Sequence, residues 1–437
     1  MSLYSAFYSG LSGLASNANA LNVVGNNLSN INTVGFKGSS TSFSDIFSST
    51  ISGVSIAGNG DPMQFGLGTQ VNGVSQNFSQ SSFQSASSAL DMAIQGNGFF
   101  TLQTASGQQV YTRDGSFSQN SNGYLVASDG SNVLGYAINP VTGVLAAAAA
   151  PIQIASGITS PASATTTITP GVNLDSSSSA GAILASPIQV YDSLGNAQSL
   201  VVTYTNNGTN PNSWNYVVTG GPSGATITGK GSSAANPGTI VFNTDGSIQS
   251  VNGNALPTPP TTAATTAANA STDLGITWGN GAAASTIQVA MVQANGQGNI
   301  TQYAAPSATS STAQDGYAAG TLSSLAVDQS GIISGTFTNG QIQKLAQVAL
   351  STFNNVNGLI QAGNNAWTQS LASGSPSIGI PNQGGRGGIL GSNLELSNVD
   401  VATEFTNMIL NQRGYEANSK IITTTDQLMQ ATLAMKQ

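Results

Sequence analysis

The chain of 437 residues carries 8 lysines and arginines against 16 aspartates and glutamates, with 5% charged residues and a net charge of −8 at pH 7. So few cations cannot form a basic patch, which excludes phosphate-driven binding of nucleic acid. Histidine and cysteine are absent, which excludes Cys/His metal sites and removes the most common general base. A polar surface with little charge offers little repulsion between copies, which suits a protein that associates with itself.

The first 30 residues have the pattern of an amphipathic helix. Alternating steps of four and three from Leu3 place apolar side chains along one seam, which is the spacing of a coiled coil. Each of the three glycines in this segment costs roughly 1 kcal/mol relative to alanine, so we expect the helix to need a partner. The seam residues expected to support self-assembly are Leu3, Phe7, Leu14, Leu21, Val24 and Leu28.

The N-terminal segment does not resemble a secretory signal peptide. No lysine or arginine precedes Lys37, and no continuous apolar run occurs there. Export from the cytoplasm would therefore use another route. No window of the chain approaches the apolar length of a membrane helix, so we expect no insertion into a membrane.

Short alternating runs from residue 71 to residue 146 predict an inner β domain. Turn dipeptides such as Asp114-Gly115 and Asn122-Gly123 separate these runs and supply the positive φ of tight hairpins. The same pattern returns in residues 318–371, where Ser330-Gly331 breaks it. We therefore assign both stretches to one domain that is split by an insertion.

Residues 147–317 form this insertion, which we predict to be an outer β domain. Strand patterns occur in it, for example over residues 187–191 and 200–204. Two tracts, Pro161 to Thr169 and Leu256 to Thr272, are rich in Ala, Thr and Pro. With so few large apolar side chains they offset little ordering entropy, and we expect both to be exposed loops.

The segment from Val399 to Lys436 predicts a second long helix, because it contains no proline and one glycine. Ser397 and Asp400 form the S-x-x-D pattern of a helix start. One apolar seam, expected to support self-assembly, comprises Val401, Phe405, Met408, Tyr415, Ile422, Met429 and Leu433. A second stripe comprises Leu410, Ala417, Ile421, Leu428, Ala431 and Met435. A helix that is apolar on two stripes has more than one neighbour.

The predicted fold is a mixed α and β, multidomain one, in which the N- and C-terminal helices pair as a coiled-coil-like bundle and all-β domains are nested between them. The expected parts are a terminal helical domain (1–30 with 397–437), a linker region (31–70 with 372–396), the inner β domain (71–146 with 318–371) and the outer β domain (147–317). The alternative is that both helices pack into one globular core.

No catalytic, cofactor-binding or metal site is expected. The segment from Gly224 to Lys230 resembles a phosphate loop but lacks the following Ser or Thr, and its centre has a strand pattern. Five aspartates lie in turn contexts, where a carboxylate accepts bonds from its own backbone. They are Asp114, Asp129, Asp192, Asp245 and Asp328. Serine lacks a base that would activate it, so we do not predict an enzyme.

Several segments resemble the flagellar rod-and-hook family of axial proteins. The N-terminal resemblance lies in residues 26–37, through Asn26, Asn27, Asn30, Asn32, Gly35, Phe36 and Lys37. The C-terminal one lies in residues 397–400 and 411–419, through Gln412, Arg413, Gly414, Tyr415 and Asn418. Residues 95–100 and 111–117 match features of the family's inner β domain.

Within this family three features favour a hook subunit over a rod subunit. Residues 190–196 resemble a hook motif, residues 402–409 are the hook-like form of the C-terminal helix, and the large insertion is expected of hooks. The resemblance implies a structural subunit that assembles into a hollow, bendable helical tube. Such a tube acts as a universal joint, transmits torque from rod to filament and lets exported subunits pass.

The resemblance also implies partners and a location. The expected partners are further copies of the chain, the distal rod protein, the hook cap protein, the hook–filament junction protein and the flagellar type III export apparatus. The expected location is the extracellular hook of the bacterial flagellum, attached to the basal body and reached without a cleaved signal peptide. No cofactor and no nucleic-acid partner are implied.

Two other functions remain open at this point. A distal rod subunit would be the same kind of polymer, but straight and rigid. A secreted β-rich adhesin or fibre protein would also suit a composition rich in Ser, Thr, Asn and Gly. Paired terminal heptads argue against the adhesin, because such fibres rarely need both chain ends together.

Overall fold

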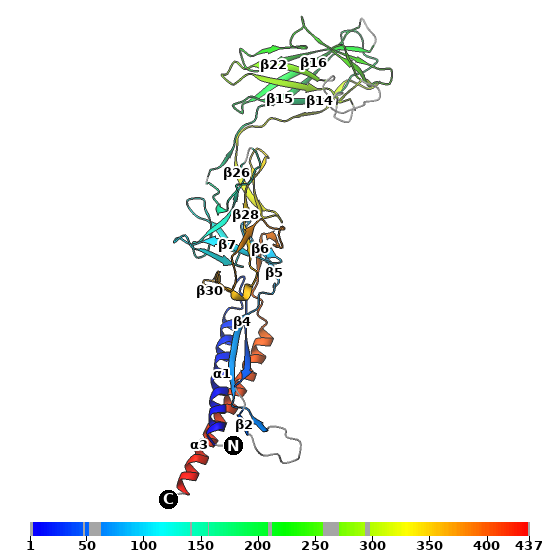
Figure 1. Ribbon diagram of the computed structural model, residues 1–437. Helices are drawn as coiled ribbons and strands as arrows, with labels where there is room; N and C mark the ends of the chain where they lie inside the picture. Colours follow the sequence, from blue (N-terminus) through cyan, green and yellow to red (C-terminus); the bar gives the residue numbers. More distant parts are fainter. Residues whose placement is uncertain are drawn as a thin grey trace. The chain divides into compact units, whose positions relative to one another are not determined.

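The computed structural model describes residues 3–46, 49–51, 63–139, 142–155, 157–208, 212–256, 271–292 and 298–435. The chain divides into two compact units. Unit 1 contains the residues up to Ser156, Ser324–Thr336 and the residues from Ile342 onward, and unit 2 contains Gly157–Ser323 with Phe337–Gln341. The described residues are mainly β-sheet, with one α-helix near each end of the chain (Figure 1), as the sequence predicted.

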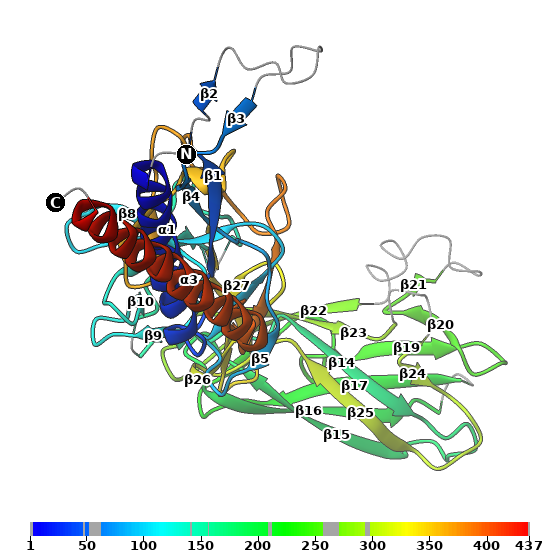
Figure 2. The same ribbon diagram turned by 90° about the horizontal axis from the view of Figure 1, so that it is seen from below.

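The helix near each terminus belongs to unit 1. Helix α1 spans Leu3–Ser29 and helix α3 spans Val401–Ala434. They lie side by side in both views (Figure 1, Figure 2) and run antiparallel. In the part of the chain that the structure describes, no helix is both long and apolar enough to cross a membrane.

Helix α3 begins at Asp400 and not at Ser397. The Asp400 carboxylate accepts a hydrogen bond from the Thr403 N–H at 2.7 Å, which satisfies a free donor of the first turn. Ser397 lies three residues before this cap, outside the helix, where its carbonyl accepts a bond from the Ser81 hydroxyl at 2.9 Å. The expected capping role of Ser397 was therefore wrong, while that of Asp400 is confirmed.

Short antiparallel strand pairs connect the helices to the rest of unit 1. Strand β1 (Ser39–Asp45) pairs with β4 (Thr69–Gln76) beside α1, and β2 (Ser49–Ile51) pairs with β3 (Met63–Phe65). Two further pairs join segments from opposite ends of the sequence. They are β5 (Phe83–Ser85) with β34 (Asn393–Glu395), and β6 (Met92–Gln95) with β33 (Gly388–Gly391). The expected linker segments thus carry strands.

The main sheet of unit 1 has the strand order β27-β28-β11-β7-β8-β31-β30. These strands are β7 (Phe99–Gln103), β8 (Gln109–Thr112), β11 (Asn132–Ala137), β27 (Ile332–Phe337), β28 (Ile342–Val348), β30 (Ile360–Gly363) and β31 (Ala366–Thr368). Flanking it are β9 (Phe117–Gln119), β10 (Leu125–Ala127), β12 (Ala150–Pro151), β29 (Leu350–Thr352) and β32 (Ser377–Gly379). Strand β11 precedes unit 2 in the sequence and β28 follows it, and the two strands pair with each other. The sheet is therefore built from two stretches of the chain that unit 2 separates.

An aromatic cluster forms one core of unit 1. Phe99, Tyr111 and Trp367 are buried, and Phe78 and Phe353 pack on them. The rings meet edge to face, for example Tyr111 and Phe353 at 4.8 Å between centroids, which is a favourable arrangement of aromatic quadrupoles. The Trp367 indole N–H donates to the Gln76 side chain at 2.7 Å, so its polar group is satisfied.

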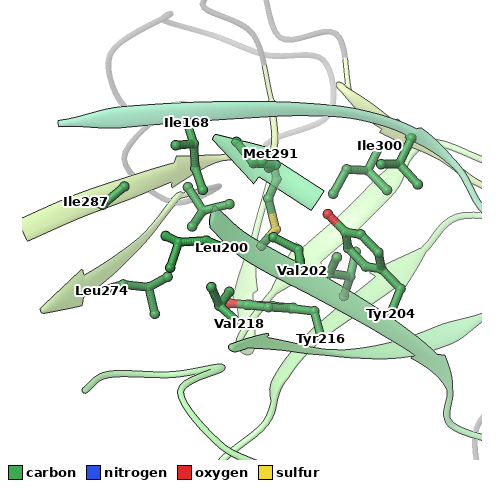
Figure 3. Packing of buried hydrophobic residues seen from close by; sticks show 14 of the residues in the cluster. Ile168, Leu200, Val202, Tyr204, Tyr216, Val218, Leu274, Ile287, Met291 and Ile300 are labelled. Atoms are coloured by element: carbon green, nitrogen blue, oxygen red, sulfur yellow. The ribbon is translucent and has the colours of Figure 1, made fainter. Parts of the chain in front are cut away.

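Unit 2 contains two six-stranded sheets. One has the order β15-β16-β17-β19-β20-β21, and the other has the order β18-β22-β23-β14-β24 with β25 beside β14. Their buried faces share one hydrophobic cluster, which includes Leu200, Tyr216 and Ile287 (Figure 3). The strands are β14 (Thr167–Asn173), β15 (Ile183–Tyr191), β16 (Ala197–Asn206), β17 (Ser213–Gly220), β18 (Thr226–Thr228), β19 (Gly238–Phe242), β20 (Ile248–Val251), β21 (Asn254–Ala255), β22 (Ser271–Thr277), β23 (Ser285–Ala290), β24 (Ile300–Thr301) and β25 (Ala308–Gln314). Strand β13 (Thr159–Ser160) pairs with the first residues of β26 (Gly320–Val327). The residues of β26 from Ser324 onward belong to unit 1, and β26 is the neighbour of β27 in the sheet order.

The tract from Pro161 to Thr169 is not an exposed loop. Its Thr165 and Ile168 are fully buried, and Ile168 belongs to β14 and to the core. Burial is possible because the Thr165 hydroxyl donates to the Gln314 side chain at 3.0 Å and accepts the Tyr191 N–H at 2.9 Å. The expectation was therefore wrong, since threonine with satisfied bonds packs like an apolar residue.

The second tract lies mostly outside the described residues. At its ends, Leu256 packs against the core of unit 2, and Thr272 is buried in β22. Thr272 is also polar and satisfied, because its hydroxyl lies 2.6 Å from the Tyr216 hydroxyl. At Thr272 the expected exposure was therefore wrong as well.

The turn role predicted for the five aspartates is confirmed. Each carboxylate accepts a backbone N–H from the residue two positions further on, at 2.9 Å in every case. The strand predicted within the Gly224 to Lys230 segment is confirmed too, as β18 pairs with β22. Among the described residues, no three Asp or Glu side chains come together as a metal site would need.

Asp192 also connects the turn after β15 to the turn before β23. Its buried carboxylate accepts bonds from the backbone N–H groups of Leu194 and Asn196 and from the Asn280 amide at 2.6 Å. Burial raises the pKa of Asp192, but the hydrogen bonds from Asn280, Asn196 and Leu194 together lower it by more than burial raises it. The pKa of Asp192 therefore lies below its usual range.

We therefore predict that Asp192→Asn destabilises unit 2 at pH 7 by about 1–3 kcal/mol, because an amide replaces an acceptor that faces several donors. A depressed pKa stabilises the fold above the unfolded value of about 3.9, and this stabilisation is lost as the pH falls below it. The difference between wild type and variant should therefore shrink below about pH 4. Urea titrations at pH 7 and below about pH 4, read by hydrogen-exchange mass spectrometry of unit 2 peptides, measure this difference in stability.

The matched control for this test is Asp245→Asn, since Asp245 has the same turn geometry with an exposed side chain. It should reduce stability clearly less than Asp192→Asn does. Equal losses from the two variants would contradict the special role of the buried carboxylate.

Candidate assembly surface

The contact between α1 and α3 includes a reciprocal packing of glycine and asparagine, beside which Gly10 of α1 meets Ile421 and Ile422 of α3. A β-carbon placed on Gly13 would lie 2.7 Å from the Asn418 side chain, and one on Gly414 would lie 2.8 Å from the Asn17 side chain. Each asparagine donates to the carbonyl of the glycine four residues earlier in its own helix, at 2.7 Å for Asn17 and 2.9 Å for Asn418. The two helices thus carry the same Gly-x-x-x-Asn pattern and pack it reciprocally. We call these four residues the glycine–asparagine contact.

A second polar link lies closer to the start of α3. The Asn27 amide donates to the Glu404 carboxylate at 3.0 Å and to the Ser39 carbonyl at 2.7 Å, while its oxygen accepts the Ser39 N–H at 2.9 Å. Asn27 is buried. It therefore ties α1, α3 and the start of β1 together, which gives the second motif asparagine a structural role.

The buried face of α1 consists mainly of small or polar residues. Its members are Gly10, Gly13, Ser16, Ala20, Val24 and Asn27. Of the apolar seam predicted on α1, Val24 is buried, whereas Phe7, Leu14, Leu21 and Leu28 are half-buried; the side chain of Leu3 lies outside the described residues. Small side chains let the two backbones approach closely.

Many large apolar side chains of both helices are exposed, although Ile421 and Ile422 of α3 also reach Gly10 of α1. On α1, Tyr4 and Tyr8 are 66% and 62% exposed, and Leu11 lies on the same face. On α3, the second predicted stripe is exposed along its whole length, from Leu410 to Met435. Of the first predicted stripe, Val401, Phe405, Tyr415 and Leu433 are exposed, while Met408, Ile422 and Met429 are half-buried. Contiguous exposed apolar side chains of this kind mark an interaction site.

A buried ionic cluster joins the helices to the sheet of unit 1. The Glu395 carboxylate lies 2.6 Å from the Lys37 ammonium and 3.3 Å from the Arg113 guanidinium, and all three side chains are buried. Lys37 also donates to the Ser79 carbonyl at 2.8 Å, and the Ser81 N–H donates to Glu395 at 3.0 Å. Burial lowers the pKa of Lys37, although its hydrogen bond with Glu395 and the charge of Glu395 oppose this.

Gly35 lies at the centre of this junction. Its φ of +66° is in the left-handed region, and a β-carbon there would lie 2.6 Å from the backbone of Arg113. Its N–H donates to the Glu395 carbonyl at 2.7 Å. Only glycine meets both demands, so the motif glycine has a specific structural reason.

The remaining motif residues fall into two groups. Asn26, Asn30 and Phe36 line cavities between α1 and the sheet of unit 1. Asn32, Gln412, Arg413 and Tyr415 are exposed. Glu395 was missed by the sequence analysis, although a signal exists, since it is the only acidic residue between Asp328 and Asp400 and stands between two leucines.

Comparison with known proteins identifies the class. Four family models match: "Flagella basal body rod protein" over residues 7–37, "Flagellar hook protein FlgE/F/G D1 domain" over 93–170, "Flagellar basal body protein FlaE D2 domain" over 160–317, and "Flagellar basal body rod FlgEFG protein C-terminal" over 391–435. Together they define an axial protein of the flagellar rod and hook, as the resemblance of the sequence motifs implied.

Curated relatives narrow this class. The flagellar hook protein FlgE of Borreliella burgdorferi is 32% identical, with 99% of each chain covered. The flagellar hook proteins FlgE of Treponema pallidum and Salmonella typhimurium are each 31% identical to this chain. Both alignments cover 99% of this chain, together with 99% of the Treponema protein and 100% of the Salmonella protein. The chain belongs to the FlgE family of flagellar hook proteins, which are structural proteins.

The glycine–asparagine contact generates a prediction about both helices. Gly13→Leu inserts a side chain where Asn418 already lies, and such overpacking costs about 1–3 kcal/mol. We expect amide exchange in α1 and α3 to become about 5- to 150-fold faster. Hydrogen-exchange mass spectrometry of the full chain measures this directly.

Gly25→Ala is the control for this prediction, because a β-carbon at Gly25 meets nothing within 4 Å. Alanine favours the helix by about 1 kcal/mol, so exchange in α1 should become slower. If Gly13→Leu left exchange in α3 unchanged, the close approach of the two helices would be refuted.

The ionic cluster generates a second prediction. Glu395→Gln leaves two buried cations without a counter-charge, which costs about 3–5 kcal/mol. We expect unit 1 to unfold at markedly lower urea concentration, measured by hydrogen-exchange mass spectrometry of its peptides.

Glu416→Gln serves as its control, since Glu416 pairs with Arg413 on the exposed surface of α3. An exposed pair contributes at most about 1 kcal/mol, so this variant should unfold almost as the wild type does. A similar, small effect of both variants would show that the buried cluster is dispensable.

Proposed function

We propose that the chain polymerises through its terminal helices into the hollow, bendable helical tube of the flagellar hook. In this role it acts as a universal joint that transmits torque from rod to filament while exported subunits pass through. The single observation that carries the proposal is the α3 stripe from Leu410 to Met435, which is exposed along its whole length.

The energetics favour burial of this stripe between copies. Fully burying a side chain such as leucine contributes about 1.5–3 kcal/mol, and Leu410 is 65% exposed within the subunit. Helices in water derive most of their stability from packing and little from propensity. Neighbouring copies would supply the packing that each subunit lacks, so a coiled-coil-like bundle of terminal helices is the proposed form of the assembly.

The proposed parts have separate roles. Residues 1–30 with 397–437 would line the channel, and residues 31–70 with 372–396 would link them to the inner β domain of 71–146 with 318–371. The outer β domain of 147–317 would lie at the surface of the tube. Only 5% of the residues are charged, so outer contacts would be weak and polar and could slide as the tube bends.

The proposal includes the place and the partners of the polymer. The extracellular hook would attach to the basal body through the distal rod protein, grow beneath the hook cap protein and end at the hook–filament junction protein. Subunits would pass through the flagellar type III export apparatus without a cleaved signal peptide. Membership of the FlgE family supports this setting.

The test uses the exposed stripe of α3. Leu410→Gln combined with Leu428→Gln removes apolar surface that is largely uncovered in the subunit, so each subunit should fold as before. We expect short hooks or none on cells that produce this variant, because the contacts between copies are lost. Electron microscopy of isolated hooks gives the readout, and hydrogen exchange of the purified chain checks its folding.

The control for this test is Ile183→Gln in unit 2, where the isoleucine is 68% exposed but lies outside the terminal helices. It should leave hook length unchanged. Normal hooks with the double α3 variant would contradict the proposed assembly surface, and straight instead of curved wild-type tubes would favour a rod subunit.

A further inference from the structure

Two adjoining cavities form one groove beside α1, with volumes of about 590 and 430 Å³. They share Asn26, Phe36, Gln76 and Gln361 in their linings. On one side lies α1, with Asn22 and Asn26, followed by Asn30 just after its end. On the other side lies the β30–β31 hairpin. We call this feature the amide-lined groove.

The groove is rich in amides and poor in charge. Among the described residues that line it, Lys37, Asp114 and Asp129 are the charged ones. Lys37 is paired with Glu395 at 2.6 Å, and each of the two carboxylates accepts hydrogen bonds within its own turn. Side-chain amides present both a donor and two acceptor lone pairs, which suits the peptide groups of an uncharged polypeptide.

Strand β30 contributes Gln361 and Gly363 to the lining of the groove, and it has a free edge. It is the last strand in the sheet order, its four residues are exposed, and among the described strands only β31 pairs with it. An exposed edge presents unpaired N–H and C=O groups to another chain. Extended segments bind such edges by strand addition, in which main-chain hydrogen bonds supply the affinity.

The asparagine face of α1 continues the apolar face already described. The exposed residues follow one line along the helix, from Tyr4, Tyr8 and Leu11 to Asn19, Asn22 and Asn26. A neighbouring copy that covers the apolar half therefore reaches the amide-lined groove on the same face. With 5% charged residues, this chain also matches the uncharged character of the groove.

From these observations we propose that the amide-lined groove is a docking site for an extended, uncharged segment of a second copy, which adds as a strand to the free edge of β30. The inference rests on the proposed polymer and names one contact within it. It would also give a second role to Asn26 and Asn30, whose side chains already bond within the subunit: the Asn30 amide donates to the Asn26 side chain at 2.9 Å, and the Asn30 side-chain oxygen accepts the Thr33 hydroxyl at 3.1 Å.

The absence of cysteine from the chain permits a specific test. Gln361→Cys places a single thiol in the groove, where benzophenone maleimide can be attached to hooks isolated from cells that produce the variant. On illumination we expect a covalent dimer of the chain, with the cross-link located by mass spectrometry in an extended segment of the second copy. The purified monomer should give no dimer.

Gln369→Cys is the matched control, since Gln369 is exposed just after β31 but does not line the groove. Because this position lies outside the proposed contact, it should give less dimer by a factor of about ten or more. Hooks that form normally but give no cross-link from residue 361 would refute the proposed docking site, and so would a cross-link to a different protein. Neither result would contradict the proposed polymer. Cells that build hooks without this chain would refute the proposed function itself.

Discussion

The Glu395 carboxylate, held between Lys37 and Arg113, is the interaction on which the arrangement of unit 1 depends. It joins the segment that leaves α1, the main sheet and the strand that precedes α3. A buried charge is tolerated only when it is paired and hydrogen-bonded, so the three segments have to come together at one point. In a chain with eight basic residues, two of them stabilise this junction.

From this junction the register of the helix pair follows. Asn27 meets Glu404 close to the junction, and the glycine–asparagine contact lies further along the same antiparallel pair. Glycine and asparagine take up little space at the contact, and many of the large apolar side chains of both helices remain exposed. The subunit therefore gains a precise geometry from its helix pair but little hydrophobic stabilisation. The apolar surface that stays exposed on the helices is available to a neighbouring copy.

Local signals made much of the fold predictable from the sequence. Turn aspartates and the two helices depend on residues close in sequence, as the Asp192 turn and the Asp400 cap illustrate. The contact face of α1 was harder to predict, because a heptad of apolar residues does not distinguish a partner within the subunit from one outside it. Thr165 and Glu395 were missed for a related reason, since their burial depends on hydrogen-bond partners 149 and 358 residues away.

The same scarcity of charge has opposite consequences inside and outside the subunit. Inside, the buried ionic cluster of Lys37, Arg113 and Glu395 is costly to break and gives unit 1 a defined internal geometry. Outside, contacts that consist of hydroxyl and amide groups are individually weak, and water can replace either partner with little loss. A tube that bends as it rotates requires neighbouring subunits to exchange such contacts repeatedly. Surfaces with few charges, whose contacts can be exchanged, meet this requirement, whereas interlocking ion pairs between copies would resist each change of register.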